Sequence, residues 1–301
     1  MADPTPSVLL FPGQGTEAVG MAAGWEAHRA WLDTLQEAED LTGAPLRRLM
    51  AEGPQEALQA QCHAPFAVLA HSVGLYRAWR GVGLPLPVAA VGHSMGCYSA
   101  LVAAGVVPLA AAVGLIAAVE ELSGSAFEGR PMGMAYVIGL AEADLRQGLA
   151  ARPALVLSNR NGRAQFTVSG PVDGLQELVA ELGPRALKAG LLPVRHPLHG
   201  PHMAALVPEV ARRLGGFAPQ APAFPLISHF DGRLLRTGGD AWDDGLASIA
   251  LPVDWLAVVA TLKGLAAPLA ECGWGNQLSG LTRWADRDLP VASLKAVPAP
   301  V

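Results

Sequence analysis

The sequence predicts an α/β protein with a large subdomain built on a parallel sheet and a smaller inserted subdomain. Two observations carry this prediction. The apolar run 88–92 leads into a Gly-His-Ser-Met-Gly turn, and an apolar helical pattern follows at once, which makes a strand–turn–helix unit. Residues 133–194 show strands and helices in the order βαββαβ, which is the ferredoxin-like order. We expect the small subdomain to span 128–197 and the large one to span 1–127 and 198–301.

Short apolar runs and helical periodicity predict the other elements of the large subdomain. Residues 7–11 read as a buried strand that ends in Pro-Gly-Gln-Gly, where glycines let the backbone approach a ligand. From Gly20 to about Trp79 the pattern is helical, and Met21, Trp25, Leu32 and Leu35 keep to one helical stripe. The remaining expected elements are helices at 65–79, within 100–119, and at 204–214, 252–265 and 277–284, with strands at 223–228 and 269–271.

The small subdomain is predicted from a change in the sequence pattern, to short strands and helices, after a Gly/Ser/Pro break at 124–131. The Asn161-Gly162 pair is a hairpin signal between two strands. The expected strands are 133–140, 154–159, 165–170 and 186–194, and the expected helices are 142–150 and 171–182.

Composition excludes several classes of function. Hydrophobic residues make up 51% of the 301 residues and charged residues 16%, which indicates a large core. The net charge of −5 and the scarcity of lysine argue against a nucleic-acid partner. Cys62, Cys97 and Cys272 are too few and too far apart for a disulfide framework or a metal knuckle.

The start of the chain has no basic region followed by a long apolar stretch, so we expect no secretory signal and a cytoplasmic protein. Residues 100–119 carry no charge and are long enough to cross a bilayer. Gly105 and Pro108 interrupt this run, so a buried helix pair is the favoured interpretation. We expect a monomer with no membrane partner.

Ser94 is the candidate nucleophile. It lies at the centre of the G-x-S-x-G elbow typical of α/β-hydrolase-like folds, where a tight turn raises the hydroxyl above the sheet. Gly92 and Gly96 fit this turn because side chains there would collide with it. The first amides of the following helix point toward any oxygen above the hydroxyl and stabilise negative charge there.

The segment 196–202 holds His196, His199 and His202, which suggests a metal site or a catalytic base. Prolines and a glycine separate the three side chains, and no carboxylate lies close in sequence. A neutral imidazole is well suited to accept a serine proton near pH 7. A single base among the three is therefore favoured over a metal.

Taken together, these residues resemble the malonyl-CoA:acyl carrier protein transacylase family, which includes the acyltransferase domains of polyketide synthases. The resemblance covers nearly the whole chain, because its landmarks occur in the same order from end to end. The landmarks are Phe11–Gly15, Gly92–Gly96, Ser158-Asn159, Pro197–His199 and Pro252–Trp255, supported by Tyr98–Leu101 and Ser279–Thr282.

The resemblance implies a Ser94–His199 dyad and ping-pong acyl transfer from CoA thioesters to the phosphopantetheine thiol of an acyl carrier protein. It also implies an oxyanion hole from the amides of Gln14 and Met95, and no permanently bound cofactor. In the family a main-chain carbonyl at the position of Asp254 orients the base. Asp254 is therefore the candidate for orienting His199, although the resemblance does not imply a contact through its carboxylate.

The sequence departs from the family at the acyl pocket. Malonyl-using members place an arginine where this chain has Val119, and a second frequent arginine falls at Gly114. A guanidinium is the natural partner of the malonyl carboxylate. We therefore expect an apolar pocket that accepts non-carboxylated acyl groups; its expected lining residues are Val119, Leu198, His93 and Asn159.

Three alternatives remain open. The same machinery would hydrolyse acyl thioesters on carrier proteins if water reached the acyl-enzyme. A malonyl transferase would be possible if Arg130 or Arg195 entered the pocket from another direction. A docking component without activity is the third, although intact Ser94, His199 and Gln14 argue against it.

Overall fold

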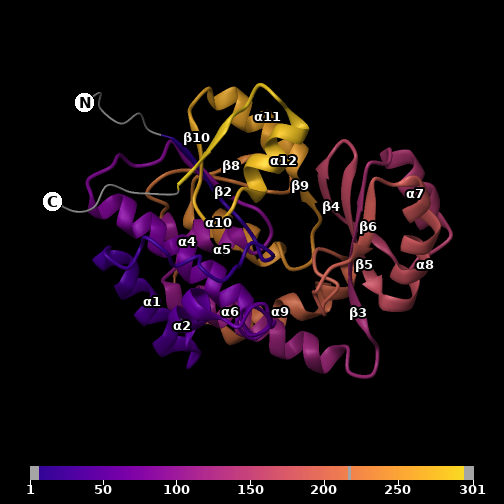
Figure 1. The fold of residues 1–301 in the computed structure, drawn as a ribbon, viewed down its shortest axis with the longest axis horizontal. Helices are drawn as coiled ribbons and strands as arrows, with labels where there is room; N and C mark the ends of the chain where they lie inside the picture. Colours follow the sequence, from indigo (N-terminus) through magenta and orange to yellow (C-terminus); the bar gives the residue numbers. More distant parts are fainter. Residues whose placement is uncertain (1–6, 216–217, 295–301) are drawn as a thin grey trace.

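The computed structural model describes residues 7–215 and 218–294, and it contains two sheets with helices around them (Figure 1). The larger sheet has six strands. Neighbouring strands from β11 to β7 run parallel, whereas β7 and β8 are antiparallel. The strand order is β11 (Val291–Ser293), β10 (Leu269–Glu271), β1 (Val8–Phe11), β2 (Ala89–Gly92), β7 (Leu226–Ile227) and β8 (Leu234–Leu235).

Two apolar layers cover the two faces of this sheet. Side chains alternate along a strand, so Leu9 and Phe11 of β1 enter one core cluster while Val8 and Leu10 enter the other. The first layer contains α1 (Arg29–Thr42), α2 (Leu46–Glu52), α3 (Gln55–Leu58), α4 (Ala64–Gly81), α5 (Gly96–Ala103), α6 (Leu109–Ala126), α9 (Val207–Arg213) and α10 (Gly238–Ala247). The second contains α11 (Trp255–Leu265) and α12 (Gln277–Ala285).

The smaller sheet confirms the ferredoxin-like order. The strands β6, β3, β5 and β4 are antiparallel neighbours, and β9 extends the sheet by pairing parallel to β4. Because β9 lies far downstream in the chain, it ties the small subdomain to the large one. The elements are β3 (Met132–Ile138), α7 (Glu142–Ala150), β4 (Val156–Gly162), β5 (Gln165–Pro171), α8 (Val172–Leu182), β6 (Lys188–Leu191) and β9 (Val253–Asp254).

Helix α6 is long and apolar enough to cross a membrane by length and composition. It nevertheless packs into the larger core, where Leu115 and Ile116 are buried. Gly105 adopts a positive φ and Pro108 is the N-cap of α6, so the two residues separate it from α5. The run 100–119 is thus a buried helix pair in this fold.

Several predicted boundaries are wrong, for local reasons. Met21 and Trp25 lie in turns rather than in a helix, although both are buried in the same core as α1. The helix expected from 252 begins at Trp255, because the two residues before it form β9. The strands β8, β9 and β11 and helix α10 were not predicted. The strands are two or three residues long and too short to show a period.

Candidate active site

Ser94 lies in the sharp turn between β2 and α5, and its φ of 54° is left-handed. Side-chain-bearing residues rarely adopt this conformation unless the surrounding structure imposes it. A Cβ at Gly92 would overlap the backbone of Gly96, and a Cβ at Gly96 would overlap the carbonyl oxygen of Phe11. Only glycine fits at both positions, so the flanking sequence imposes the turn that raises the hydroxyl.

The hydroxyl of Ser94 is hydrogen-bonded to His199, with 2.6 Å between Oγ and Nε2. His199 also has a left-handed φ, of 58°, and its backbone N–H donates to the carbonyl of Ile249 at 3.0 Å. This backbone contact fixes the loop that brings the imidazole back to the elbow across 105 residues of sequence. The pair has the geometry of a nucleophile with its general base.

The other two histidines of the 196–202 segment have separate partners. His196 Nε2 is 2.8 Å from Glu120 Oε2, and His202 Nε2 is 2.8 Å from the carbonyl oxygen of Ala154. Among the described residues, no group of three or more His, Cys, Asp or Glu could hold a metal ion. The three imidazoles therefore do not converge on one point.

The environment keeps His199 neutral. Burial, followed by the nearby His93, lowers the pKa of His199 to about 4, whereas the carbonyls of Ser248 and Leu251 oppose this shift. The ring of His229 lies edge-on to His199, with 6.1 Å between centroids, and burial holds the pKa of His229 well below its usual range. A neutral imidazole can accept a proton from Ser94 over the whole physiological pH range.

Asp254 does not orient His199, which corrects the expectation from the sequence. Its Oδ1 accepts hydrogen bonds from the backbone N–H groups of Leu256 and Ala257, so it is the N-cap of α11. The same carboxylate binds Arg160 of β4, with Nε 3.1 Å from Oδ1. The carboxylate of Asp254 therefore stabilises the N-terminus of α11 and the junction between β4 and β9.

The backbone amides of Gln14 and Met95 are free to bind an oxygen. No hydrogen bond within the described residues involves the N–H of either residue, and both residues line the cavity beside Ser94. Met95 is the N-cap residue of α5, so its amide lies at the positive end of a helix dipole. The side chain of Gln14 points to Gln61, with 3.0 Å between Nε2 and Oε1.

A cavity of about 40 Å³ lies next to Ser94 and His199. Of the expected pocket residues, Val119 and Leu198 line it, whereas His93 and Asn159 are not among its described lining residues. His93 is turned aside, because its Nε2 is 2.7 Å from Asn161 Oδ1 and its ring packs against Trp255. The other lining residues are Gln14, Pro65, Met95, Tyr98, Leu115, Ile116, Glu120, Ser248 and Ile249.

Glu120 is a pocket residue that the sequence analysis missed. Its Oε1 accepts a hydrogen bond from Gln61 Nε2 at 2.7 Å, and its Oε2 faces His196. The available signal was a carboxylate directly after a long uncharged run in a core helix, where charges are rarely buried without partners. Its partners come from segments about 60 and 76 residues away, which no local pattern reveals.

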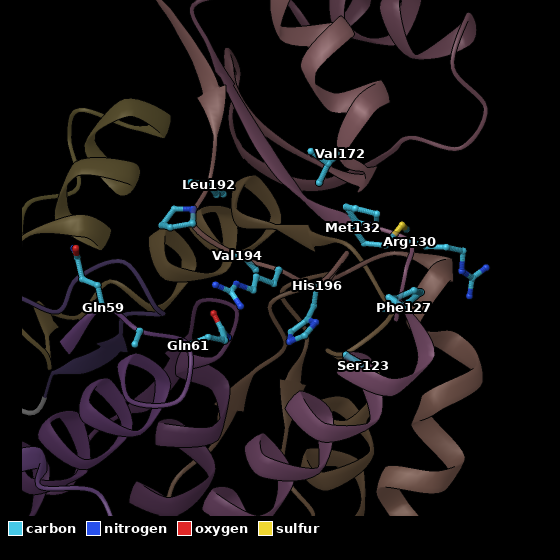
Figure 2. Close-up of a pocket in the computed structure, with 15 residues that line it drawn as sticks. Gln59, Gln61, Ser123, Phe127, Arg130, Met132, Val172, Leu192, Val194 and His196 are labelled. Carbon is cyan, nitrogen blue, oxygen red and sulfur yellow. The ribbon is translucent and has the colours of Figure 1, made fainter. Parts of the chain in front are cut away.

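Arg130 and Arg195 line a different and larger cleft, of about 620 Å³, between the two subdomains (Figure 2). The guanidinium of Arg130 donates to the carbonyl of Ala126 at 2.8 Å and is turned away from Gln61 and His196 in the close-up. Neither arginine is among the described residues around the 40 Å³ cavity. The relocated arginine considered above is therefore absent from this pocket.

Cys97 lies in the first turn of α5, directly after the elbow. Its thiol lies 3.5 Å from the hydroxyl of Ser248, and burial raises the pKa of Cys97 to about 12. A thiol that stays protonated at neutral pH is not a competing nucleophile. Cys97 therefore acts as a packing residue.

Known proteins match this chain along most of its length. The acyl transferase domain family matches residues 8–237. The malonyl CoA-acyl carrier protein transacylase of Escherichia coli strain K12 is 33% identical over 286 residues, which cover 93% of this chain and 92% of the relative. The polyketide biosynthesis protein ThaF of Burkholderia thailandensis is 33% identical over 283 residues, but this match covers only 24% of that longer protein.

Solved structures agree with the sequence matches. The malonyl-CoA:acyl carrier protein transacylase of Xanthomonas oryzae superposes with a TM-score of 0.88 at 30% identity, covering 99% of this chain and 96% of that one. A malonyl-transacylase in complex with its type II polyketide synthase acyl carrier protein gives a TM-score of 0.89 at 27% identity, with 98% and 97% covered. By its elbow, its two sheets and these matches, the chain belongs to the acyltransferase family that includes the malonyl-CoA:acyl carrier protein transacylases.

Proposed function

We propose that this acyltransferase moves an acyl group from coenzyme A to the phosphopantetheine thiol of an acyl carrier protein, through an acyl-enzyme on Ser94, and that it prefers non-carboxylated acyl groups. The observation that carries the proposal is the 2.6 Å hydrogen bond between Ser94 and a buried, neutral His199 at the mouth of the acyl pocket. The names of the relatives support the carrier protein and the thioester as substrates.

In the first half-reaction, the Ser94 hydroxyl oxygen attacks the thioester carbonyl carbon while its proton passes to His199 Nε2. The carbon–sulfur bond then breaks, and the departing thiolate takes the proton from the imidazolium. In the second half-reaction, His199 accepts the proton of the pantetheine thiol, whose sulfur attacks the acyl-serine. The carbon–oxygen bond breaks, and the proton returns to Ser94.

The tetrahedral intermediates place negative charge on the former carbonyl oxygen. The unpaired amides of Gln14 and Met95 are suited to stabilise it, because donors fixed in advance need no reorganisation during the reaction. Each such donor is worth roughly 3 to 4 kcal/mol of transition-state stabilisation in other enzymes.

The chemistry of the pocket supports the acyl preference. Among the described residues that line it there is no Lys or Arg. The family resemblance implies that Val119 stands at the position of the arginine in malonyl-using members. A malonyl carboxylate would lose hydration without gaining a cationic partner, which costs several kcal/mol for a buried ion. An acetyl group has no such cost, so acetyl or similar short acyl groups fit better.

The test is to incubate the protein with acetyl-, butyryl-, hexanoyl- and malonyl-CoA and to weigh the intact protein over time, with a Ser94→Ala variant as control. Acetyl labelling at Ser94 that passes to an added holo-acyl carrier protein is the expected result. Rapid release of free acid with little transfer would favour the thioester hydrolase instead. Malonyl labelling faster than acetyl labelling would contradict the acyl preference.

A further inference from the structure

We propose that Glu120 is a specificity-determining residue, which forms the end wall of the acyl pocket, excludes carboxylated acyl groups and limits the length of uncharged ones. The inference rests on the proposed function, because the pocket is meaningful only if an acyl group is attached at Ser94. The absence of an arginine at position 119 explains only why a malonyl group gains no partner. The present inference adds that the carboxylate of Glu120 actively excludes such a group.

Both carboxylate oxygens of Glu120 are held in place. Gln61 Nε2 donates to Oε1 at 2.7 Å, and His196 Nε2 lies 2.8 Å from Oε2. Gln61 in turn accepts a hydrogen bond from the Gln14 side chain at 3.0 Å, so a continuous chain of contacts runs from the loop after β1 to His196. A side chain with two fixed oxygens acts as a rigid wall and does not move aside without losing both contacts.

This chain of contacts separates two spaces. Glu120 lines the 40 Å³ cavity beside Ser94, whereas its partners Gln61 and His196 line the 620 Å³ cleft between the subdomains. Figure 2 shows Gln61 and His196 among the side chains that line that cleft. Removing the Glu120 side chain would therefore open the small cavity toward the large cleft.

The charge of the wall accounts for the exclusion of carboxylated groups. A malonyl carboxylate attached at Ser94 would extend into the pocket and face the carboxylate of Glu120. Like charges that face one another in a protein pocket repel, because they are screened less there than in bulk water. The adjacent His196 does not offer a free partner to such a carboxylate, because its Nε2 is directed at Glu120 at 2.8 Å.

The position of the wall accounts for the length limit. The cavity beside Ser94 has a volume of only about 40 Å³, and a single buried water already needs roughly 10–15 Å³. A malonyl group reaches the wall only with its terminal carboxylate, whereas the six-carbon hexanoyl chain is long enough to extend past it. Longer chains would need the wall to open into the larger cleft.

Three variants test the two roles separately, with Glu121 as the matched control. Glu120→Gln keeps the shape and removes the charge, and Glu120→Ala removes both. Gln61→Ala opens the wall from the other side if Glu120→Ala does not fold. Glu121→Gln makes the same charge change one residue away, on a side chain that is 67% exposed and paired with Arg213 at 2.8 Å.

The measurement is the initial rate of acyl-enzyme formation with acetyl-, malonyl- and hexanoyl-CoA by intact-protein mass, with circular dichroism as the folding check. We expect Glu120→Gln to raise the malonyl-to-acetyl ratio at least tenfold and to leave the hexanoyl-to-acetyl ratio within twofold. We expect Glu120→Ala or Gln61→Ala to raise the hexanoyl-to-acetyl ratio at least tenfold. Glu121→Gln should match the parent protein in both ratios.

Two results would overturn the inference while acetyl labelling persists. An unchanged malonyl-to-acetyl ratio in Glu120→Gln would show that the charge of Glu120 does not exclude carboxylated groups. An unchanged hexanoyl-to-acetyl ratio in folded Glu120→Ala and Gln61→Ala would show that Glu120 does not limit the chain length. Failure of the parent protein to form any acyl-serine is a different outcome, because it would overturn the proposed function itself.

Discussion

The strongest quantitative prediction concerns the pH dependence of Ser94 acylation. Burial lowers the pKa of His199 to about 4, so the base stays neutral well below the usual range of histidine. At pH 5.0 an imidazole with a pKa of about 4 is roughly 90% neutral, whereas one with an ordinary pKa of about 6.5 is roughly 3% neutral. The two cases differ about 30-fold in the fraction of competent enzyme.

The assay is the second-order rate of acetyl-enzyme formation at limiting acetyl-CoA between pH 4.5 and 8, which reports ionisations of the free enzyme. We expect the rate at pH 5.0 to lie within about twofold of the rate at pH 8, because little of the base is lost to protonation. A rate that declines with a midpoint near pH 6.5, measured on folded protein, would refute the assignment of a buried neutral base.

The free energy of unfolding should fall as the pH is lowered, and this change has to be measured separately from the acylation rate. His199 and His71 are buried, and burial lowers the pKa of His71 to about 3. The unfolded chain therefore binds protons first as the pH falls below about 6.5, and unfolding becomes easier. At pH 5.0 each histidine removes about 2 kcal/mol of folding free energy by this linkage, and the loss continues until the pH passes the folded pKa. Urea unfolding at pH 5 and pH 8 measures the difference.

Four further substitutions have defined outcomes. Ser94→Ala should abolish the acyl-enzyme mass shift with acetyl-CoA while thermal unfolding stays cooperative; any remaining label would place the nucleophile elsewhere. Val119→Arg, made in the Glu120→Gln background so that the new guanidinium has no competing carboxylate, should raise malonyl labelling about tenfold over Glu120→Gln alone, because arginine pairs with carboxylate. Gly96→Ala should lower the free energy of unfolding by about 3 kcal/mol or more, since its Cβ would overlap a β1 carbonyl, and a melting temperature near that of the parent protein would contradict this packing. Asp254→Ala should cost about 1–2 kcal/mol of stability through loss of the α11 N-cap, yet leave the pH profile of acylation unchanged; a shifted profile would show that this carboxylate acts on the base after all.

The candidate site divides into a part readable from the sequence and a part that is not. Ser94 was identified because its turn is local: two glycines, a strand before them and a helix after them lie within about ten residues. His199 was proposed from a family resemblance, and the residues alone left three histidines open. Glu120 was missed because its role depends on partners from two distant segments.

The sequence by itself determined the order of most strands and helices, the ferredoxin-like insertion and the elbow, because hydrophobic period and glycine sterics act between near neighbours. Tertiary structure alone decided which imidazole reaches Ser94, which arginine binds Asp254, and what closes the acyl pocket. Each of these depends on contacts between segments about 60 to 105 residues apart. Only the packing of the two sheets and their helices sets the distances across which such side chains can bind.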